Sequence, residues 1–128
     1  MPTIGELVEQ EAVAVARHEP LANAAKHMFE HRVGAVVVLE DSTRLVGIFT
    51  ERDLLRACAA GVDTQAATVG NWMTHNPVTV TTDTHAAAAL QVMIDRDFRH
   101  LPVLGEGGVV GVVSMRRLSR ALQHERMG

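Results

Sequence analysis

The sequence has one cysteine, no excess of basic charge and no long apolar run, and each shortage excludes a class of protein. A lone Cys58 excludes an intramolecular disulfide and leaves no thiol cluster for zinc, which favours a reducing, cytoplasmic location. We expect Cys58 to be an apolar filler on a helix. The net charge of −3 lacks the basic excess typical of general nucleic-acid binders, so nucleic acid is disfavoured as a partner.

Signals for membranes, secretion and catalysis are also missing. The longest apolar runs, such as residues 34–39, are too short to cross a bilayer, and the first residues lack the basic and apolar regions of a signal peptide. No Gly-x-Ser-x-Gly elbow or phosphate loop with lysine is present. His27 and His31 are four residues apart without a supporting thiol or carboxylate pair. We therefore expect no membrane association, no enzyme, no metal site and no obligatory cofactor.

The sequence does contain an internal repeat, in a chain whose composition is that of an ordinary globule, with 47% hydrophobic and 21% charged residues. Residues 45–55 return as residues 109–118. Each copy predicts a β-branched strand with one glycine, followed by a helix whose N-cap is Thr50 or Ser114, because the apolar period changes there from two to helical.

Other segments recur in the same order. Residues 3–8 and 68–73 predict short helical segments, and residues 13–15 and 78–80 predict short strands. The following helices each carry an apolar stripe that should face a core. The stripes are Leu21, Ala24, Ala25, Met28 and Phe29 in the first copy, and Ala86, Ala89, Leu90, Met93 and Ile94 in the second.

The last recurring segments, residues 34–39 and 100–104, predict one further strand per copy. The sequence thus predicts an α+β fold of two βαββα repeats, at residues 1–62 and 68–124, with a linker at 63–67 and a polar tail at 125–128. Pro102 lies inside a predicted strand, which implies an edge strand or a place where something other than a strand lies alongside. Trp72 is interpreted as a packing residue rather than a platform for a base.

The helix start at Thr50 has two interpretations. Asp53 stands three residues later, the spacing of a capping box in which hydroxyl and carboxylate satisfy backbone N–H groups. Alternatively, the Asp53 carboxylate accepts the hydroxyls of a sugar whose phosphate lies near the helix end, where unpaired N–H groups attract anions. The spacing favours the cap and leaves the second possibility open.

Taken together, these motifs resemble a tandem pair of CBS domains, the modules named after cystathionine β-synthase. The resemblance covers nearly the whole chain and is strongest in residues 47–53, 72–80 and 99–103. It implies two repeats packed about a pseudo-twofold axis, two clefts for adenosine-type ligands, and a homodimer. Carried over by position, it implies that Asp53 holds a ribose, Thr50 lies near the ribose and phosphate, and Val78 offers backbone groups to the base. Arg99, His100 and Arg116 would face the phosphate.

The mirror cleft departs from this pattern. Arg117 stands where Asp53 stands, and Gly34 and Ala35 stand where Arg99 and His100 stand. We therefore expect one competent cleft per chain, and an acidic partner or anion near Arg117, because a cation in the first turn opposes the helix dipole.

The resemblance implies a stand-alone regulatory module that binds AMP, ADP or ATP and signals to an unidentified protein. One alternative is a dimeric scaffold with vestigial clefts. The other is nucleic-acid binding through arginines, namely Arg96, Arg99, Arg116, Arg117 and Arg120.

Overall fold

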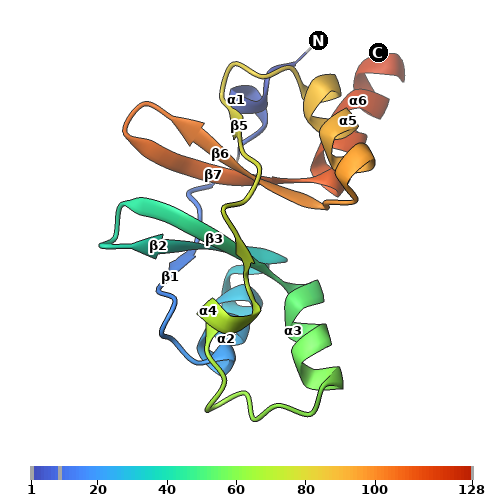
Figure 1. Ribbon diagram of the computed structural model, residues 1–128. Helices are drawn as coiled ribbons and strands as arrows, with labels where there is room; N and C mark the ends of the chain where they lie inside the picture. The colour runs from blue at the N-terminus through green and yellow to red at the C-terminus, as the bar shows by residue number, and fades with distance from the viewer. Residues whose placement is uncertain (1, 9, 128) are drawn as a thin grey trace. The chain divides into compact units, whose positions relative to one another are not determined.

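The computed structural model describes residues 2–8 and 10–127 and has the predicted α+β character (Figure 1). It divides into two compact units. Residues 12–77 form one unit, and the N-terminal residues up to 11 join residues from 78 onward in the other. Each unit has its own buried hydrophobic core.

The unit of residues 12–77 contains a four-stranded sheet in the order β1-β2-β3-β4, in which β1 and β2 are parallel and the other pairs antiparallel. Helices α2 and α3 contact each other and the sheet. The elements are β1 (Ala14–Val15), α2 (Leu21–His31), β2 (Ala35–Glu40), β3 (Arg44–Thr50), α3 (Glu51–Ala59), α4 (Val69–Trp72) and β4 (Thr74–His75).

The other unit contains a three-stranded sheet in the order β5-β6-β7. Its elements are α1 (Ile4–Leu7), β5 (Val80–Thr81), α5 (Ala86–Arg96), β6 (His100–Gly105), β7 (Gly108–Ser114) and α6 (Met115–Met127). The predicted order of strand, helix, strand, strand and helix is therefore present in both repeats. Helix α6 includes residues 125–127 of the predicted tail, and Gly128 lies outside the described residues.

The duplication extends to irregular features. The register shifts between Val38 and Leu39 in β2, and at the matching place in β6. Helices α2 and α5 both end at a non-glycine residue in the left-handed conformation, Arg32 with φ 56° and Asp97 with φ 57°. A left-handed residue is a common helix stop because its N–H reaches back to carbonyls of the last turn. Both repeats thus use the same turn between helix and strand.

The short helices join the unit formed by the other repeat. In α1, the N–H of Gly5 donates to the carbonyl of Thr82 at 2.9 Å. In α4, the N–H of Gly70 donates to the carbonyl of Arg17 at 2.8 Å. A Cβ atom at either glycine would lie 3.1 Å from the Cβ atom of its partner, which explains a glycine at both positions. The domain bounds predicted from the sequence follow the repeats rather than these compact units.

The predicted apolar stripes are correct except at their last positions. Leu21, Ala24 and Met28 are buried, whereas Phe29 is 86% exposed and Ile94, at the matching position of α5, is 58% exposed. Because successive helical residues turn by about 100°, Phe29 lies beyond the edge of the buried stripe. The expectation for Cys58 is wrong for the same reason: it is exposed, one residue from the buried Ala57.

The first strand of the second repeat begins later than predicted. Strand β5 starts at Val80, so Val78 precedes it by two residues. Strand β6 is central, which makes the edge position predicted for Pro102 wrong. However, β5 pairs with β6 only at Val103 and Leu104. Pro102 has no N–H with which to extend this pairing, and the second interpretation, that something other than a strand lies alongside it, stays a prediction.

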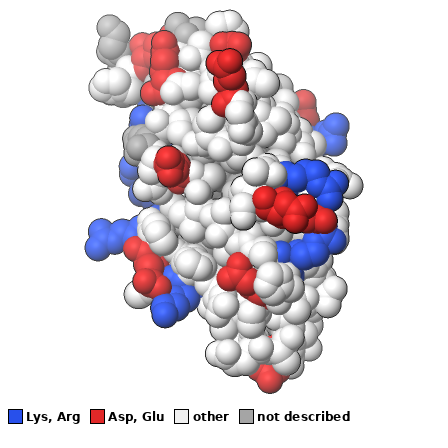
Figure 2. Space-filling view, turned by 90° about the vertical axis from the view of Figure 1, so that its left-hand side faces the viewer, with Lys and Arg blue, Asp and Glu red and all other residues white. Residues whose placement is uncertain are grey.

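Charges of both signs share the surface. On the face that Figure 2 shows, Lys and Arg side chains stand beside Asp and Glu side chains. Among the described residues, the carboxylate of Glu40 lies 2.9 Å from the guanidinium of Arg44 and 3.3 Å from that of Arg17. On the face drawn in Figure 2, this interspersed pattern differs from the basic stripe expected of a nucleic-acid binder.

Candidate functional site

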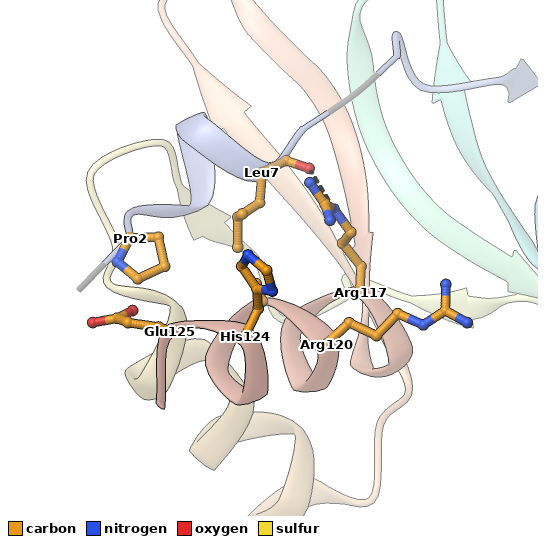
Figure 3. A pocket seen from close by; sticks show the side chains of 7 residues that line it. Pro2, Leu7, Arg117, Arg120, His124 and Glu125 are labelled. Atoms are coloured by element: carbon orange, nitrogen blue, oxygen red, sulfur yellow. Dashed lines mark hydrogen bonds between the residues drawn. The ribbon is translucent and has the colours of Figure 1, made fainter. Parts of the chain in front are cut away.

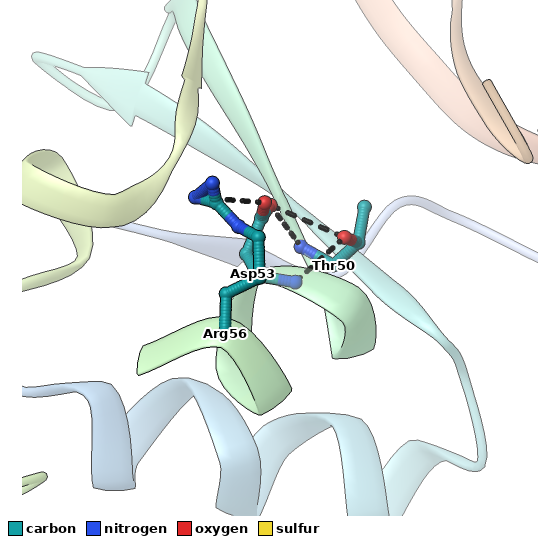
Figure 4. Close-up of polar contacts among 3 residues, drawn as sticks. All are labelled: Thr50, Asp53 and Arg56. Carbon is teal, nitrogen blue, oxygen red and sulfur yellow. Dashed lines mark hydrogen bonds and ion pairs between the residues drawn. The ribbon is translucent and has the colours of Figure 1, made fainter. Parts of the chain in front are cut away.

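The start of α3 forms the predicted capping box (Figure 4). The backbone N–H of Asp53 donates to Thr50 Oγ1 at 3.3 Å, and the N–H of Thr50 donates to Asp53 Oδ2 at 2.9 Å. The Thr50 hydroxyl also donates to Oδ2, at 3.1 Å. Asp53 is 7% exposed, the one buried charged residue in the described part of the chain. The cap prediction is confirmed, and it holds the carboxylate in a fixed orientation.

The cap uses only one oxygen of this carboxylate. The other, Oδ1, lies 3.7 Å from a terminal nitrogen of Arg56, one turn further along α3. The same guanidinium lies over the ring of Trp72, 5.7 Å from the ring centroid. Since Oδ1 makes an ion pair but no close hydrogen bond, it is the oxygen of this carboxylate that a sugar hydroxyl could use as an acceptor. The cap and the ligand interpretations of Asp53 are therefore compatible.

Sequence reasoning missed Arg56. The available signal was its position three residues after Asp53, which places the two side chains on one face of a helix. Trp72 packs against the core of its unit, as predicted.

The second repeat keeps the hydroxyl cap at its helix start but has an arginine, Arg117, in place of the Asp53 carboxylate. The N–H of Arg117 donates to Ser114 Oγ at 3.1 Å, as the N–H of Asp53 does to Thr50. The Arg117 Nε atom donates to the carbonyl of Leu7 at 3.4 Å. This carbonyl dipole compensates part of the unfavourable charge at the helix start.

A groove of about 530 Å³ lies between α1 and α6 (Figure 3). By position in the repeat, Leu7 matches Trp72 and Arg120 matches Arg56. The place where a large ring and a guanidinium stack in one unit is thus hollow in the other. The lining residues are Pro2, Leu7, Arg117, Arg120, Ala121, His124 and Glu125.

The three residues predicted to face a phosphate lie together at one end of their unit. His100 is opposite Ser114 in the β6–β7 ladder, and the carbonyl of Arg99 accepts a hydrogen bond from the N–H of Met115 at 2.8 Å. Arg116 is the second residue of α6 and is exposed, as is Arg99. Thr50 and Asp53 belong to the other unit, so the pairing of the two groups around one ligand stays a prediction.

Pro102 also changes the bonding of Val78. In the first repeat, the N–H of Val37 donates to the carbonyl of Val13 at 2.9 Å. The matching residues in the second repeat are Pro102 and Val78, and proline has no N–H to donate. The Val78 carbonyl thus lacks the donor that its counterpart has, which fits the expectation that Val78 offers a backbone group to a ligand.

Possible metal and membrane features are limited within residues 2–8 and 10–127. His31 Nδ1 lies 2.9 Å from the carbonyl oxygen of His27, and the ring centroids are 6.1 Å apart. The described residues contain no cluster of three or more His, Cys, Asp or Glu side chains suited to a metal ion. None of the described helices combines the length and apolar character needed to span a bilayer.

Comparison with known proteins identifies the repeat. The CBS domain model matches residues 4–60 and 69–124. An uncharacterised 17.7 kDa protein of Acidianus ambivalens is 38% identical over 120 residues, which cover 93% of this chain and 72% of that protein. Hypoxic response protein 1 of Mycobacterium tuberculosis is 32% identical over 123 residues, covering 95% of this chain and 86% of that protein.

Two solved structures extend the comparison. A structure of hypoxic response protein 1, described as having two coordinated zinc ions, matches with a TM-score of 0.78 over 92% of this chain and 97% of that chain, at 32% identity. A CBS domain protein of Pyrobaculum aerophilum complexed with AMP matches with a TM-score of 0.86 over 96% of both chains, at 27% identity.

Proposed function

Because the chain belongs to the CBS domain family, we propose that it is a regulatory module that binds an adenine nucleotide, AMP, ADP or ATP, and signals its presence to a partner protein. The observation that carries the proposal is the buried carboxylate of Asp53, oriented by the Thr50 cap through one oxygen while the other lies outside the cap. The AMP complex of the Pyrobaculum aerophilum relative supports the ligand class. The proposal includes no catalysed reaction and no obligatory cofactor.

In this proposal the ribose hydroxyls donate to Asp53, and Val78 offers its carbonyl to the base. Arg99, His100 and Arg116 contact the phosphate, because guanidinium groups give charge-assisted hydrogen bonds to phosphate oxygens. Ligand binding changes the balance between conformational states only as far as the ligand prefers one of them. A partner protein would read the preferred state.

Calorimetric titration with AMP, ATP and S-adenosylmethionine tests the ligand class. We expect an adenine nucleotide to bind the wild-type chain, and Asp53→Asn to weaken binding at least tenfold, since an amide oxygen accepts less strongly than a carboxylate. The matched control is Asp83→Asn, which changes an exposed aspartate of the other unit by the same atoms. Absence of binding by all three compounds, or equal affinity of both variants, contradicts the proposal.

The phosphate contacts have a separate test. Arg99→Ala and Arg116→Ala should weaken AMP binding but leave adenosine binding nearly unchanged, because adenosine has no phosphate. Arg96→Ala removes an exposed arginine from the last turn of α5 and serves as control. An equal loss of affinity for AMP and for adenosine would show that these arginines do not contact the phosphate.

We also propose a homodimer, because exposed apolar side chains recur on the helices. Phe29 on α2 and Leu55 on α3 are 86% and 69% exposed in one unit, and Ile94 repeats the Phe29 position in the other. Large apolar side chains in water at repeated positions favour association with a second copy. Sedimentation velocity should give a dimer for the wild-type chain and a monomer for Phe29→Asp, with Glu30→Asp as control. A wild-type monomer contradicts this proposal.

Two alternatives predict different results. A scaffold with vestigial clefts predicts dimers without any nucleotide binding. Nucleic-acid binding predicts affinity for oligonucleotides that falls steeply with salt, because phosphate contacts release counterions.

A further inference from the structure

The position of Arg56 bears directly on the proposed ligand site. Its guanidinium lies 3.7 Å from Asp53 Oδ1, the oxygen that the cap does not use. It also covers the ring of Trp72, at 5.7 Å from the centroid. A ligand hydroxyl that donates to Oδ1 must approach the same lone pairs. Arg56 and such a ligand therefore compete for one oxygen.

The matching groove in the other unit shows what space this arrangement occupies. There, Leu7 and Arg120 take the positions of Trp72 and Arg56, and a hollow of about 530 Å³ remains between α1 and α6. Both sites have the same backbone arrangement. A short helix, α4 or α1, contacts the helix that follows the second long strand, α3 or α6. The stacked side chains of Arg56 and Trp72 therefore stand at the position that is open in the other unit.

Arg56 is able to leave this position at small cost. Its side chain is 55% exposed, whereas the Asp53 side chain is 10% exposed. Exposed ion pairs and exposed cation–π contacts are weak, because water solvates a released guanidinium well. The helix cap fixes the Asp53 carboxylate, while the Arg56 guanidinium that competes for it is accessible to solvent.

From these contacts we infer that Arg56 controls access to Asp53: without ligand it occupies Oδ1 and the face of Trp72, and ligand hydroxyls displace it. The inference rests on the proposed function, since it requires that Asp53 accept a ligand. It assigns to Arg56 a role opposite to that of Arg99 and Arg116. Removal of Arg56 should strengthen binding although it removes a cation that would attract a phosphate.

Calorimetric titration of Arg56→Ala with AMP tests the inference. We expect affinity about threefold to tenfold higher than wild type, the range set by one weak ion pair and one exposed cation–π contact. Arg44→Ala is the matched control, because it also removes one exposed, ion-paired arginine from the same unit. It should bind AMP no more tightly than wild type.

Trp72 gives an independent measurement, because it is the only tryptophan of the chain. Ligand binding should change its fluorescence more in the wild-type chain than in Arg56→Ala, where no guanidinium leaves the ring. Weaker or unchanged AMP affinity of Arg56→Ala, with binding that still depends on Asp53, overturns this inference and leaves the proposed function intact. Failure of the wild-type chain to bind AMP, ATP and S-adenosylmethionine overturns both.

Discussion

Replacing Gly47 by alanine tests how Met73, the residue that follows α4, packs against the central strand β3. A Cβ atom at this position would overlap Met73 Sδ and would lie 3.0 Å from the carbonyl oxygen of Thr74. Met73 is 6% exposed, so its side chain has little room to move. Overpacking of this kind typically costs about 1–3 kcal/mol. We expect Gly47→Ala to lower the free energy of unfolding by that amount.

A double-mutant cycle separates this contact from other effects. Met73→Ala alone should cost about 2–5 kcal/mol, because it leaves a cavity in the core. In the Gly47→Ala background it should cost less, since the shortened side chain no longer meets the new methyl group. Urea unfolding followed by Trp72 fluorescence measures all four proteins. An unchanged midpoint for Gly47→Ala, or additive losses in the double variant, would refute the reasoning.

Three further predictions concern stability and are measured by urea unfolding. Thr50→Ala should cost about 1 kcal/mol through loss of the helix cap, whereas Thr50→Ser should cost little. Ser114→Ala should cost a similar amount, because its hydroxyl makes the matching bond to the Arg117 N–H; equal stability of the alanine and wild-type proteins would contradict either cap. Leu101→Ala should cost about 2–5 kcal/mol, because this residue is 1% exposed, whereas Phe29→Ala should change the stability of the monomer little. A larger loss of stability for Phe29→Ala than for Leu101→Ala would contradict the assignment of Phe29 to the surface.

The elements of the fold were predictable where their signals are local. The change of apolar period at Thr50 and Ser114 marks a real helix start, and the spacing to Asp53 gives the capping box. Similarly, the recurrence of whole segments predicts the order of elements in both units, because equivalent local patterns fold into equivalent local structure.

Features that depend on tertiary contacts were not predictable. The short segments at residues 3–8 and 68–73 have nearly the same apolar pattern, so the sequence does not show that each packs with the other repeat. The burial of Phe29 was predicted wrongly because periodicity defines the centre of a stripe better than its edge. Arg56 was missed because its role depends on Trp72, which lies on a different helix.

The two helix starts show how the repeats diverged in chemistry while keeping one fold. In both, a hydroxyl oxygen accepts the N–H of the residue three positions later, at 3.3 Å in α3 and 3.1 Å in α6. That residue is Asp53 in one repeat and Arg117 in the other, so the backbone geometry tolerates either charge. The fold therefore does not require an aspartate at this position, although in α3 the Asp53 carboxylate completes the capping box. A ligand bound to the oxygen outside the cap would give this carboxylate a role beyond the cap, and Asp53→Asn and Arg56→Ala test that role with opposite expected signs.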